Sequence, residues 1–154
     1  MSIWWSLHLR REAASVPLAR RLLLGTMETA GVDPDVSYDL SVALSEACAN
    51  AVEHGGDASA ADYRVTARID GDTCRIEVID SGPGFADKLR ARGRRTPTRS
   101  HQPASDRAEH GRGLFLIESL TDHVRVRNRS GGPGAVVSFD KILKWREGAL
   151  LRAV

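Results

Sequence analysis

Residues 44–55 read LSEACANAVEHG and carry three polar side chains on one face of a predicted helix, and the face around them is otherwise small or apolar. Glu46, Asn50 and His54 recur at four-residue steps, so they share one helix face. Asn is a poor residue for a helix interior, and a buried amide beside a carboxylate needs polar partners. A divalent cation with bound water supplies such partners, because Mg²⁺ accepts a neutral Asn oxygen and a nearby Glu can accept a proton. A solvated polar stripe is the alternative for this pattern.

Two helices are predicted in the first third of the chain. Apolar residues at three- and four-residue steps predict a helix over 15–30, which Gly31 ends. A second helix begins at Pro34 with Asp33 as its N-cap, and it runs through the stretch above to about residue 54. The three polar side chains therefore belong to the second half of this long helix.

Alternating polar and apolar residues predict five strands. They cover residues 3–9, 62–70, 73–80, 123–129 and 135–143. An Asp-Gly-Asp turn joins the second strand to the third and is typical of a hairpin. Helices grouped against hairpins predict an α+β fold, in which helices cover one face of a mixed β-sheet.

Length and composition limit the class of protein. The chain has 154 residues, with 22 Lys and Arg against 20 Asp and Glu and a net charge of +2, which is typical of one globular domain covering residues 1–154. No apolar run approaches the roughly 18 residues of a membrane span, and the first residues lack the pattern of a secretion signal. Two cysteines do not make a disulfide framework. We therefore expect a soluble, cytoplasmic protein with no membrane partner.

Four other residues carry structural expectations. Cys48 lies between apolar helix positions and Cys74 starts a strand, so both are expected to be buried thiols. Trp4 and Trp5 are adjacent in a predicted strand, so their side chains face opposite sides of the sheet. One of the two is expected in the core, and the other is a candidate for an interface with a partner or a second subunit.

A carboxylate followed by two glycines ends the third strand. Asp80 precedes Gly82, Gly84 and Phe85. A carboxylate at a strand end can accept a hydrogen bond from an exocyclic amine, and the glycines let a flat ligand approach the backbone. A tight turn after the strand is the alternative for this motif.

A second glycine pair opens a short helix predicted over 113–121. Gly111, Arg112, Gly113 and Leu114 begin it, and the backbone N–H groups at such a start suit phosphate. Neither glycine pair extends to the dinucleotide-binding pattern G-x-G-x-x-G, and the phosphate loop G-x-x-x-x-G-K-[ST] is absent from the chain. The usual phosphate motifs therefore do not explain these glycines.

Residues 86–110 separate the two glycine pairs and have almost no apolar periodicity. A structureless stretch of this length inside a compact domain is often a functional lid. It carries seven Lys and Arg against three Asp and Glu, a net charge of +4, which leaves −2 for the rest of the chain. A triphosphate or an acidic protein surface would match this charge, and a solvated loop is also compatible with it. Nucleic acid is disfavoured because the segment lacks interleaved aromatic residues.

Taken in order, these motifs resemble those of the GHKL ATPase superfamily, which includes gyrase, Hsp90, histidine kinases and MutL. The series is Glu46-x-x-x-Asn50, Asp80-x-Gly82-x-Gly84, the lid, and Gly111-x-Gly113. In that superfamily these are the N box, the first glycine box, the ATP lid and the second glycine box. The compact length and the string LSEACANAVEHG look like the anti-sigma-factor serine/threonine kinases of the RsbW and SpoIIAB type. The resemblance covers residues 8 to 142, which is nearly the whole chain.

This resemblance implies a Bergerat-type two-layer sandwich with a flexible ATP lid over about 86–110 and a site for ATP and Mg²⁺. Glu46 would be the general base and Asn50 the Mg²⁺ ligand. Asp80 would bind the adenine amine, with Gly84 behind the base. The other nucleotide-binding residues would be His54, Gly82, Phe85, Gly111, Arg112, Gly113 and Leu114.

The resemblance also implies an activity and partners. Members of the family are ATP-dependent serine/threonine kinases that phosphorylate an anti-anti-sigma factor, sequester a sigma factor as homodimers, and regulate transcription by partner switching without direct contact to nucleic acid. The alternative is a nucleotide-dependent binding regulator without phosphotransfer, which would not need a base at Glu46. The catalytic half of a histidine kinase is disfavoured because the upstream His8 lies in a predicted strand. Ala135 departs from the pattern, since many superfamily members have a Thr there.

Overall fold

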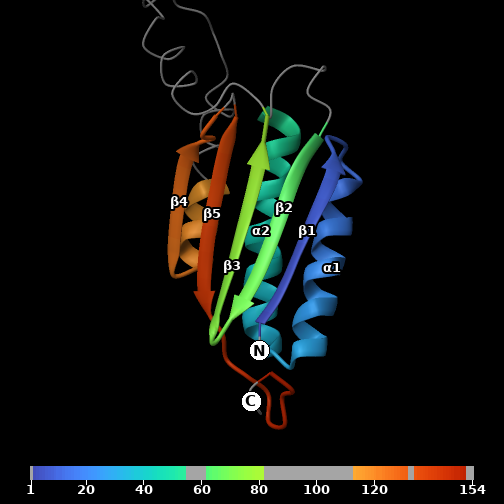
Figure 1. Ribbon diagram of the computed structural model, residues 1–154, viewed down its shortest axis with the longest axis vertical. Coiled ribbons are helices and arrows are strands. Elements are labelled where there is room, and N and C mark those ends of the chain that lie inside the picture. The colour runs from blue at the N-terminus through green and yellow to red at the C-terminus, as the bar shows by residue number, and fades with distance from the viewer. Residues whose placement is uncertain (1, 55–61, 82–112, 132–133, 152–154) are drawn as a thin grey trace, which may run out of the picture.

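The computed structural model describes residues 2–54, 62–81, 113–131 and 134–151 (Figure 1). Its elements are β1 (Ser2–Arg10), α1 (Ser15–Ala30), α2 (Pro34–His54), β2 (Asp62–Asp70), β3 (Thr73–Asp80), β4 (His123–Asn128) and β5 (Ala135–Ile142). Residues 113–120 form a further helix between β3 and β4. These bounds confirm the predicted helices and strands, while the lid over 86–110 lies outside the described residues. Among the described helices, none is long and apolar enough to cross a membrane.

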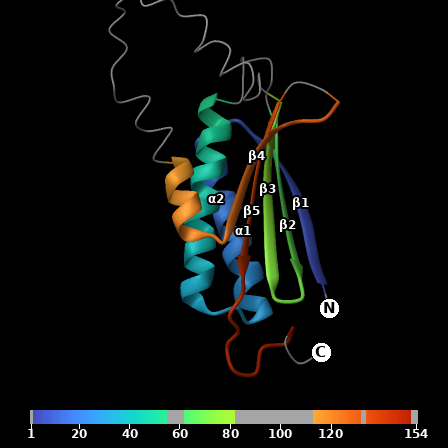
Figure 2. The ribbon, with the colours of Figure 1, turned by 90° about the vertical axis from the view of Figure 1, so that its left-hand side faces the viewer.

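The five strands form one sheet in the order β1-β2-β3-β5-β4. The helices α1, α2 and 113–120 all lie on one face of it (Figure 2), so the predicted two-layer α+β fold is confirmed. The predicted mixed sheet is wrong for the described strands, because every neighbouring pair is antiparallel. The reason is the helix pair: α1 and α2 run in opposite directions and return the chain to the end where β1 stopped, so β2 runs back beside β1 (Figure 1).

The start of α2 is set by its cap. Asp33 Oδ1 accepts a hydrogen bond from the N–H of Asp35 at 2.9 Å, and the Asp33 carbonyl accepts one from the N–H of Ser37 at 3.0 Å. The first bond satisfies an N–H group that a helix start leaves without an intrahelical partner. The predicted N-cap is confirmed, and it determines the register at which the polar face of α2 meets the neighbouring elements.

Alternate side chains of the strands fill the space beneath the helices. On β3 these are Cys74, Ile76, Val78 and Asp80, and all four are buried. The largest fully buried side chains come from both layers: Leu23, Met27, Leu40, Leu44, Ile69, Ile76, Ile117 and Phe139. Burying one such side chain contributes about 1.5–3 kcal/mol, so the register of the strands is held strongly.

The two tryptophans lie on opposite sides of the sheet, as predicted. Trp5 is half-buried beneath the helices, where its Nε1 donates a hydrogen bond to Thr26 Oγ1 at 3.2 Å. Trp4 is 65% exposed on the other face. Trp5 is therefore the core residue of the pair, and Trp4 is the candidate for an interface.

A buried polar contact joins α1, α2 and β2. The hydroxyls of Tyr63 and Ser15 lie 2.6 Å apart, and Tyr63 also hydrogen-bonds to the thiol of Cys48. Burial raises the pKa of Cys48 to about 12, although the bond to Tyr63 acts in the opposite direction. Burial also raises the pKa of Cys74 to about 12. Both cysteines are thus buried neutral thiols, as predicted.

The segment that follows β5 crosses the lower end of the molecule in Figure 1, where it bonds to the β2–β3 turn and to the α1–α2 turn. Trp145 Nε1 donates to Asp72 Oδ1 at 2.8 Å, and the N–H of Arg146 donates to the carbonyl of Gly31 at 2.7 Å. Gly31 has a φ of +88°, and a Cβ placed on it would lie 2.5 Å from the Cβ of Ala149. Gly31 therefore ends α1 and also leaves room for the C-terminal segment.

Gly31→Ala should lower the free energy of unfolding by about 2 kcal/mol, because a Cβ there is strained in the left-handed region and meets Ala149. The matched control is Gly25→Ala in the middle of α1, where a Cβ has open space. That substitution should raise the free energy of unfolding by roughly 0.5–1 kcal/mol, since Ala is the better helix former. Urea denaturation of the two variants measures both changes, and changes of the same sign would contradict this account.

The two thiols should resist modification in the folded protein. At pH 8, a disulfide reagent such as DTNB should react with neither Cys48 nor Cys74, because burial excludes the reagent and the raised pKa values keep the thiolate fraction very small. Both should react once urea unfolds the chain, and the absorbance of the released thiolate counts them. Fast stoichiometric reaction in native buffer would contradict the buried placement.

Candidate functional site

Glu46 and Asn50 lie on the side of α2 that meets the start of the 113–120 helix. Both side chains are half-buried. A Cβ placed on Gly113 would lie 3.4 Å from Glu46 Oε2 and 3.5 Å from the side-chain nitrogen and oxygen of Asn50. Gly113 itself is buried at the first described position of its helix. The polar face of α2 and the second glycine pair, far apart in the sequence, therefore meet in space.

This contact places a helix start beside a carboxylate and an amide. The first N–H groups of a helix have no intrahelical partner, and they attract phosphate. Leu114, the next residue, is half-buried and packs against the hydrophobic core. Leu114 therefore anchors the helix start, while the absence of a side chain at Gly113 leaves space next to Glu46 and Asn50.

Asp80 ends β3 with its side chain on the helix-covered face of the sheet. It is only 8% exposed. Its Oδ1 accepts a hydrogen bond from the N–H of Ala135 at 3.2 Å. This bond crosses from β3 to β5 just beyond Ile79 and Val136, the last pair of the ladder. A backbone donor on the neighbouring strand thus orients the carboxylate.

Gly134 is a site residue that the motifs do not identify. Its φ is +140°, and a Cβ placed on it would overlap the carbonyl oxygen of Asp80. The backbone at 134 can lie against the end of β3 only because the residue has no side chain, and this approach brings the Ala135 N–H to Asp80. The Ser-Gly-Gly-Pro-Gly run before β5 is the sequence signal that could have indicated it. The departure at Ala135 leaves this bond intact, because the donor is a backbone group.

The described site residues gather at one end of the molecule. α2 and β3 end there, and β5 and the 113–120 helix begin there, at the top of Figure 1.

At the other end of the short helix, Lys141 Nζ donates to the carbonyl of Leu120 at 2.8 Å and lies 3.8 Å from Asp39 Oδ2. Lys141 therefore links the short helix and α2 to β5.

The remaining predicted site residues lie outside the described part of the chain. They are Gly82, Gly84, Phe85, Gly111, Arg112 and the side chain of His54. The basic lid over 86–110 lies outside it as well. Their roles stay predictions.

The side chains at this site fit a magnesium ion that is held mainly by the phosphates of a bound nucleotide. Within the described residues, no group of three or more His, Cys, Asp or Glu side chains could hold a metal. Mg²⁺ commonly takes one or two protein ligands together with waters and substrate phosphates, so it does not need such a cluster. The half-buried Asn50, whose side chain lies next to Gly113, is the residue that could offer it an oxygen.

The model of the histidine kinase-like ATPase domain family matches residues 9–141. The chain belongs to this family. It is similar to the serine-protein kinase RsbW of Bacillus velezensis, with 33% identity over 131 residues that cover 83% of this chain and 80% of the relative. The RsbW of Bacillus subtilis is 35% identical over 128 residues, which cover 80% of this chain and 78% of the relative. The chain therefore also belongs to the RsbW family of serine-protein kinases, and the resemblance and the kinase class drawn from the motifs are confirmed.

Solved structures share the architecture. The RsbU and RsbW domains of a Mycobacterium tuberculosis protein match with a TM-score of 0.67 at 21% identity, covering 93% of this chain and 32% of that chain. The SiaB–SiaC complex from Pseudomonas aeruginosa matches with a TM-score of 0.53 at 12% identity, covering 90% and 88%. At these identities the likeness confirms the α+β fold of this family.

Gly134→Ala should weaken ATP binding at least tenfold, because the new Cβ pushes the end of β5 away from Asp80 and misplaces its carboxylate. Gly131→Ala is the matched control, since Gly131 also has a positive φ of +83° but its Cβ would meet nothing. Gly131→Ala should lose about 1–2 kcal/mol of stability from backbone strain, and Gly134→Ala should lose more because its Cβ also overlaps the Asp80 backbone. Only Gly134→Ala should change the Kd for ATP, as measured by calorimetry. An equal loss of ATP affinity in both would show that Gly134 acts through general stability.

Proposed function

We propose that this chain is an ATP-dependent serine/threonine kinase that phosphorylates an anti-anti-sigma partner and also holds a sigma factor. The phosphorylation state of one partner would then decide whether the other is sequestered. The observation that supports the proposal is the position of Gly113, on which a Cβ would lie 3.4–3.5 Å from the side chains of Glu46 and Asn50, so the first described turn of the 113–120 helix lies beside a carboxylate and an amide. Membership of the RsbW family of serine-protein kinases supports the reaction class.

Glu46 is the general base of the proposed reaction. Its carboxylate takes the proton from the Ser or Thr hydroxyl of the partner as that oxygen bonds to the γ-phosphorus of ATP and the bond to ADP breaks. Asn50 holds Mg²⁺ through its side-chain oxygen. Bound Mg²⁺ offsets the negative charge on the transferred phosphoryl group. The N–H groups at the start of the 113–120 helix hold phosphate oxygens in the same region.

Asp80 is the proposed recognition residue for adenine. Its carboxylate accepts a hydrogen bond from the exocyclic amine, and the Ala135 N–H holds the carboxylate in place for this contact. Guanine presents a carbonyl oxygen at the equivalent position of its ring, which a carboxylate repels. This arrangement favours ATP over GTP as the phosphoryl donor.

The partner assignments rest on different support. The name of the relatives, serine-protein kinase, supports a protein hydroxyl as the acceptor. The anti-anti-sigma factor, the sigma factor and a homodimer come from the resemblance of the motifs in LSEACANAVEHG and the two glycine boxes. Direct contact with nucleic acid is not part of the proposal.

Phosphotransfer to candidate anti-anti-sigma proteins tests the proposal. With γ-labelled ATP and Mg²⁺, label should move to a Ser or Thr of one partner. Glu46→Gln should lower the transfer rate at least about 100-fold, because general bases typically contribute 10²–10⁴-fold, while the Kd for ATP changes less than about threefold. Glu28→Gln, at an exposed position of α1, should transfer at the unaltered rate and controls for loss of a carboxylate.

Three results would contradict the proposal. ATP binding without transfer to any candidate would indicate the binding regulator. Unimpaired transfer by Glu46→Gln would remove Glu46 from the mechanism. Absence of Mg-ATP binding, or ATP binding that Asp80→Ala leaves unchanged, would contradict the nucleotide site itself.

A further inference from the structure

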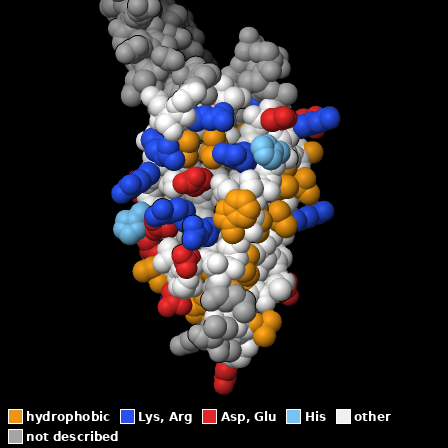
Figure 3. Space-filling model, viewed as in Figure 1, with side chains coloured by type: hydrophobic (Ala, Val, Ile, Leu, Met, Phe, Trp, Pro, Cys, Tyr) orange, Lys and Arg blue, Asp and Glu red, His pale blue; other side chains and the backbone are white. Residues whose placement is uncertain are grey.

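The sheet has a face that no described helix covers. Figure 3 views this face directly, and its Lys and Arg side chains gather mainly in the upper half. Antiparallel sheets commonly leave one face in water, so an open face by itself needs no partner. The evidence for a binding partner is the arrangement of charged side chains on this face.

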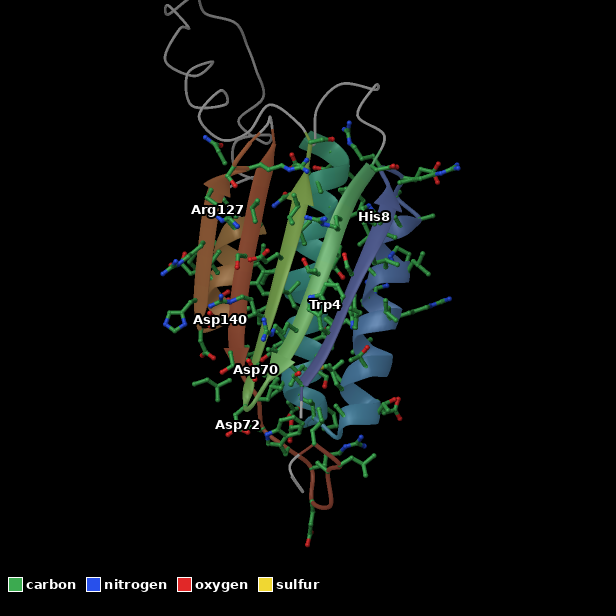
Figure 4. All side chains as sticks on the ribbon, viewed as in Figure 1. Trp4, His8, Asp70, Asp72, Arg127 and Asp140 are labelled. Atoms are coloured by element: carbon green, nitrogen blue, oxygen red, sulfur yellow. The ribbon has the colours of Figure 1, made fainter. Side chains whose placement is uncertain are left out.

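The strand register aligns basic and apolar side chains in one row across the open face. The row runs His8, Arg64, Ile79, Val136 and Arg127, through β1, β2, β3, β5 and β4. Figure 4 shows His8 and Arg127 near the two sides of this face. Between Arg64 and Arg127 there are three inter-strand steps of about 4.8 Å, a span of roughly 14 Å. Two guanidinium groups thus bracket an apolar centre formed by Ile79 and Val136.

Two carboxylates lower on the open face, Asp140 and Asp70, already have basic partners. Asp140 lies 2.8 Å from His123 and 3.7 Å from Arg75. Asp70 lies 3.4 Å from Arg68. These pairs offset charge on the lower part of the face, whereas the upper row, His8 to Arg127, contains two arginines and no carboxylate.

The two arginines of the upper row, and Arg129 just beyond β4, have no such neighbours. Among the described residues, no carboxylate lies within ion-pair distance of Arg64, Arg127 or Arg129. The Nε of Arg64 is moreover buried and has no hydrogen-bond partner within the described part of the chain. A buried donor without a partner is uncommon in native structures and costs free energy until a ligand satisfies it.

A cavity of about 190 Å³ lies at Arg64. His8, Ile79 and Arg129 help to line it, and so do Asp62 and Asp80. The carboxylate of Asp80 is turned to the other face, where it is bonded to Ala135. Since a water molecule takes about 30 Å³, the cavity has room for the carboxylate end of a side chain.

We propose that the open face of the sheet is a docking surface for an acidic protein partner, which places carboxylates on Arg64 and Arg127 and an apolar side chain on Ile79 and Val136. In an extended segment, residues i and i+4 lie roughly 13 Å apart on the same side, with i+2 between them. This spacing matches the row. Trp4, 65% exposed on the same face, extends the surface with a residue type that is enriched in interface hot spots.

A protein partner fits this face better than nucleic acid does. Glu77 and Asp140 lie on the same face as the arginines, since Glu77 pairs with Ser138 and Arg75 with Asp140 in the ladder. Interspersed carboxylates repel a continuous phosphate backbone, whereas a protein surface can place opposite charges against each of them. The proposal does not depend on the nucleotide site, which lies on the helix-covered face, so the two can fail separately.

The test uses the full chain without nucleotide and a peptide that carries the matching pattern, three Glu-Ser-Val-Ser repeats followed by Glu, capped at both ends. Titration of isotope-labelled protein, followed by NMR, should shift the amides of Arg64, Ile79, Val136 and Arg127. Arg64→Gln/Arg127→Gln should raise the Kd at least tenfold, and the single Arg127→Gln, at an exposed position, should raise it about threefold. Added salt should weaken binding, since the contacts are ionic.

Arg20→Gln/Arg21→Gln is the matched control, because it removes the same charge from exposed positions of α1 on the helix side. Its Kd should stay within twofold of the unaltered chain. Equal losses in both double variants, equal binding of a peptide with Gln in place of Glu, or shifts confined to other residues would overturn the proposal. So would tighter binding of a twelve-residue oligothymidylate to the same row, or self-association through this row that excludes the peptide.

Discussion

Every second side chain of β3 enters the core, and this alternation places Asp80 on the helix-covered face and Ile79 on the open one. β3 lies in the middle of the sheet, between β2 and β5, so its register is held on both sides. A slip of one residue would expose Cys74, Ile76 and Val78 and would turn Asp80 towards solvent. The core and the candidate nucleotide site therefore depend on the same alternation.

Glycines complete the site at two places where backbones and side chains must come close. Gly113 lets the start of a helix lie against Glu46 and Asn50, and Gly134 lets the start of β5 lie against the end of β3. A Cβ at Gly134 would overlap the Asp80 backbone, whereas one at Gly113 would make ordinary contact with Glu46 and Asn50. Neither glycine contributes a reacting group. The first contact brings phosphate donors to a carboxylate, and the second orients the carboxylate of Asp80.

The two faces of the sheet separate two kinds of interaction. The helix-covered face carries the groups that fit a nucleotide, while the open face carries unneutralised arginines around an apolar centre. Because β3 contributes to both, a small kinase domain can present a partner surface without taking residues from its nucleotide site. This division is compatible with a protein that works through exchange of partners.

Much of this protein was determined by local sequence. Asp33 and Gly31 mark helix ends through their own backbone preferences, the Asp-Gly-Asp turn sets a hairpin, and polar–apolar alternation assigns strand faces, so elements, core cysteines and the order of motifs could all be predicted. Tertiary structure alone decided the rest. β2 is antiparallel to β1 because α1 and α2 return the chain to the end where β1 stopped, and the row of Arg64 and Arg127 exists only through strand pairing. Gly134 acquires its role because β5 pairs with β3, a contact between segments far apart in the chain that no local pattern encodes.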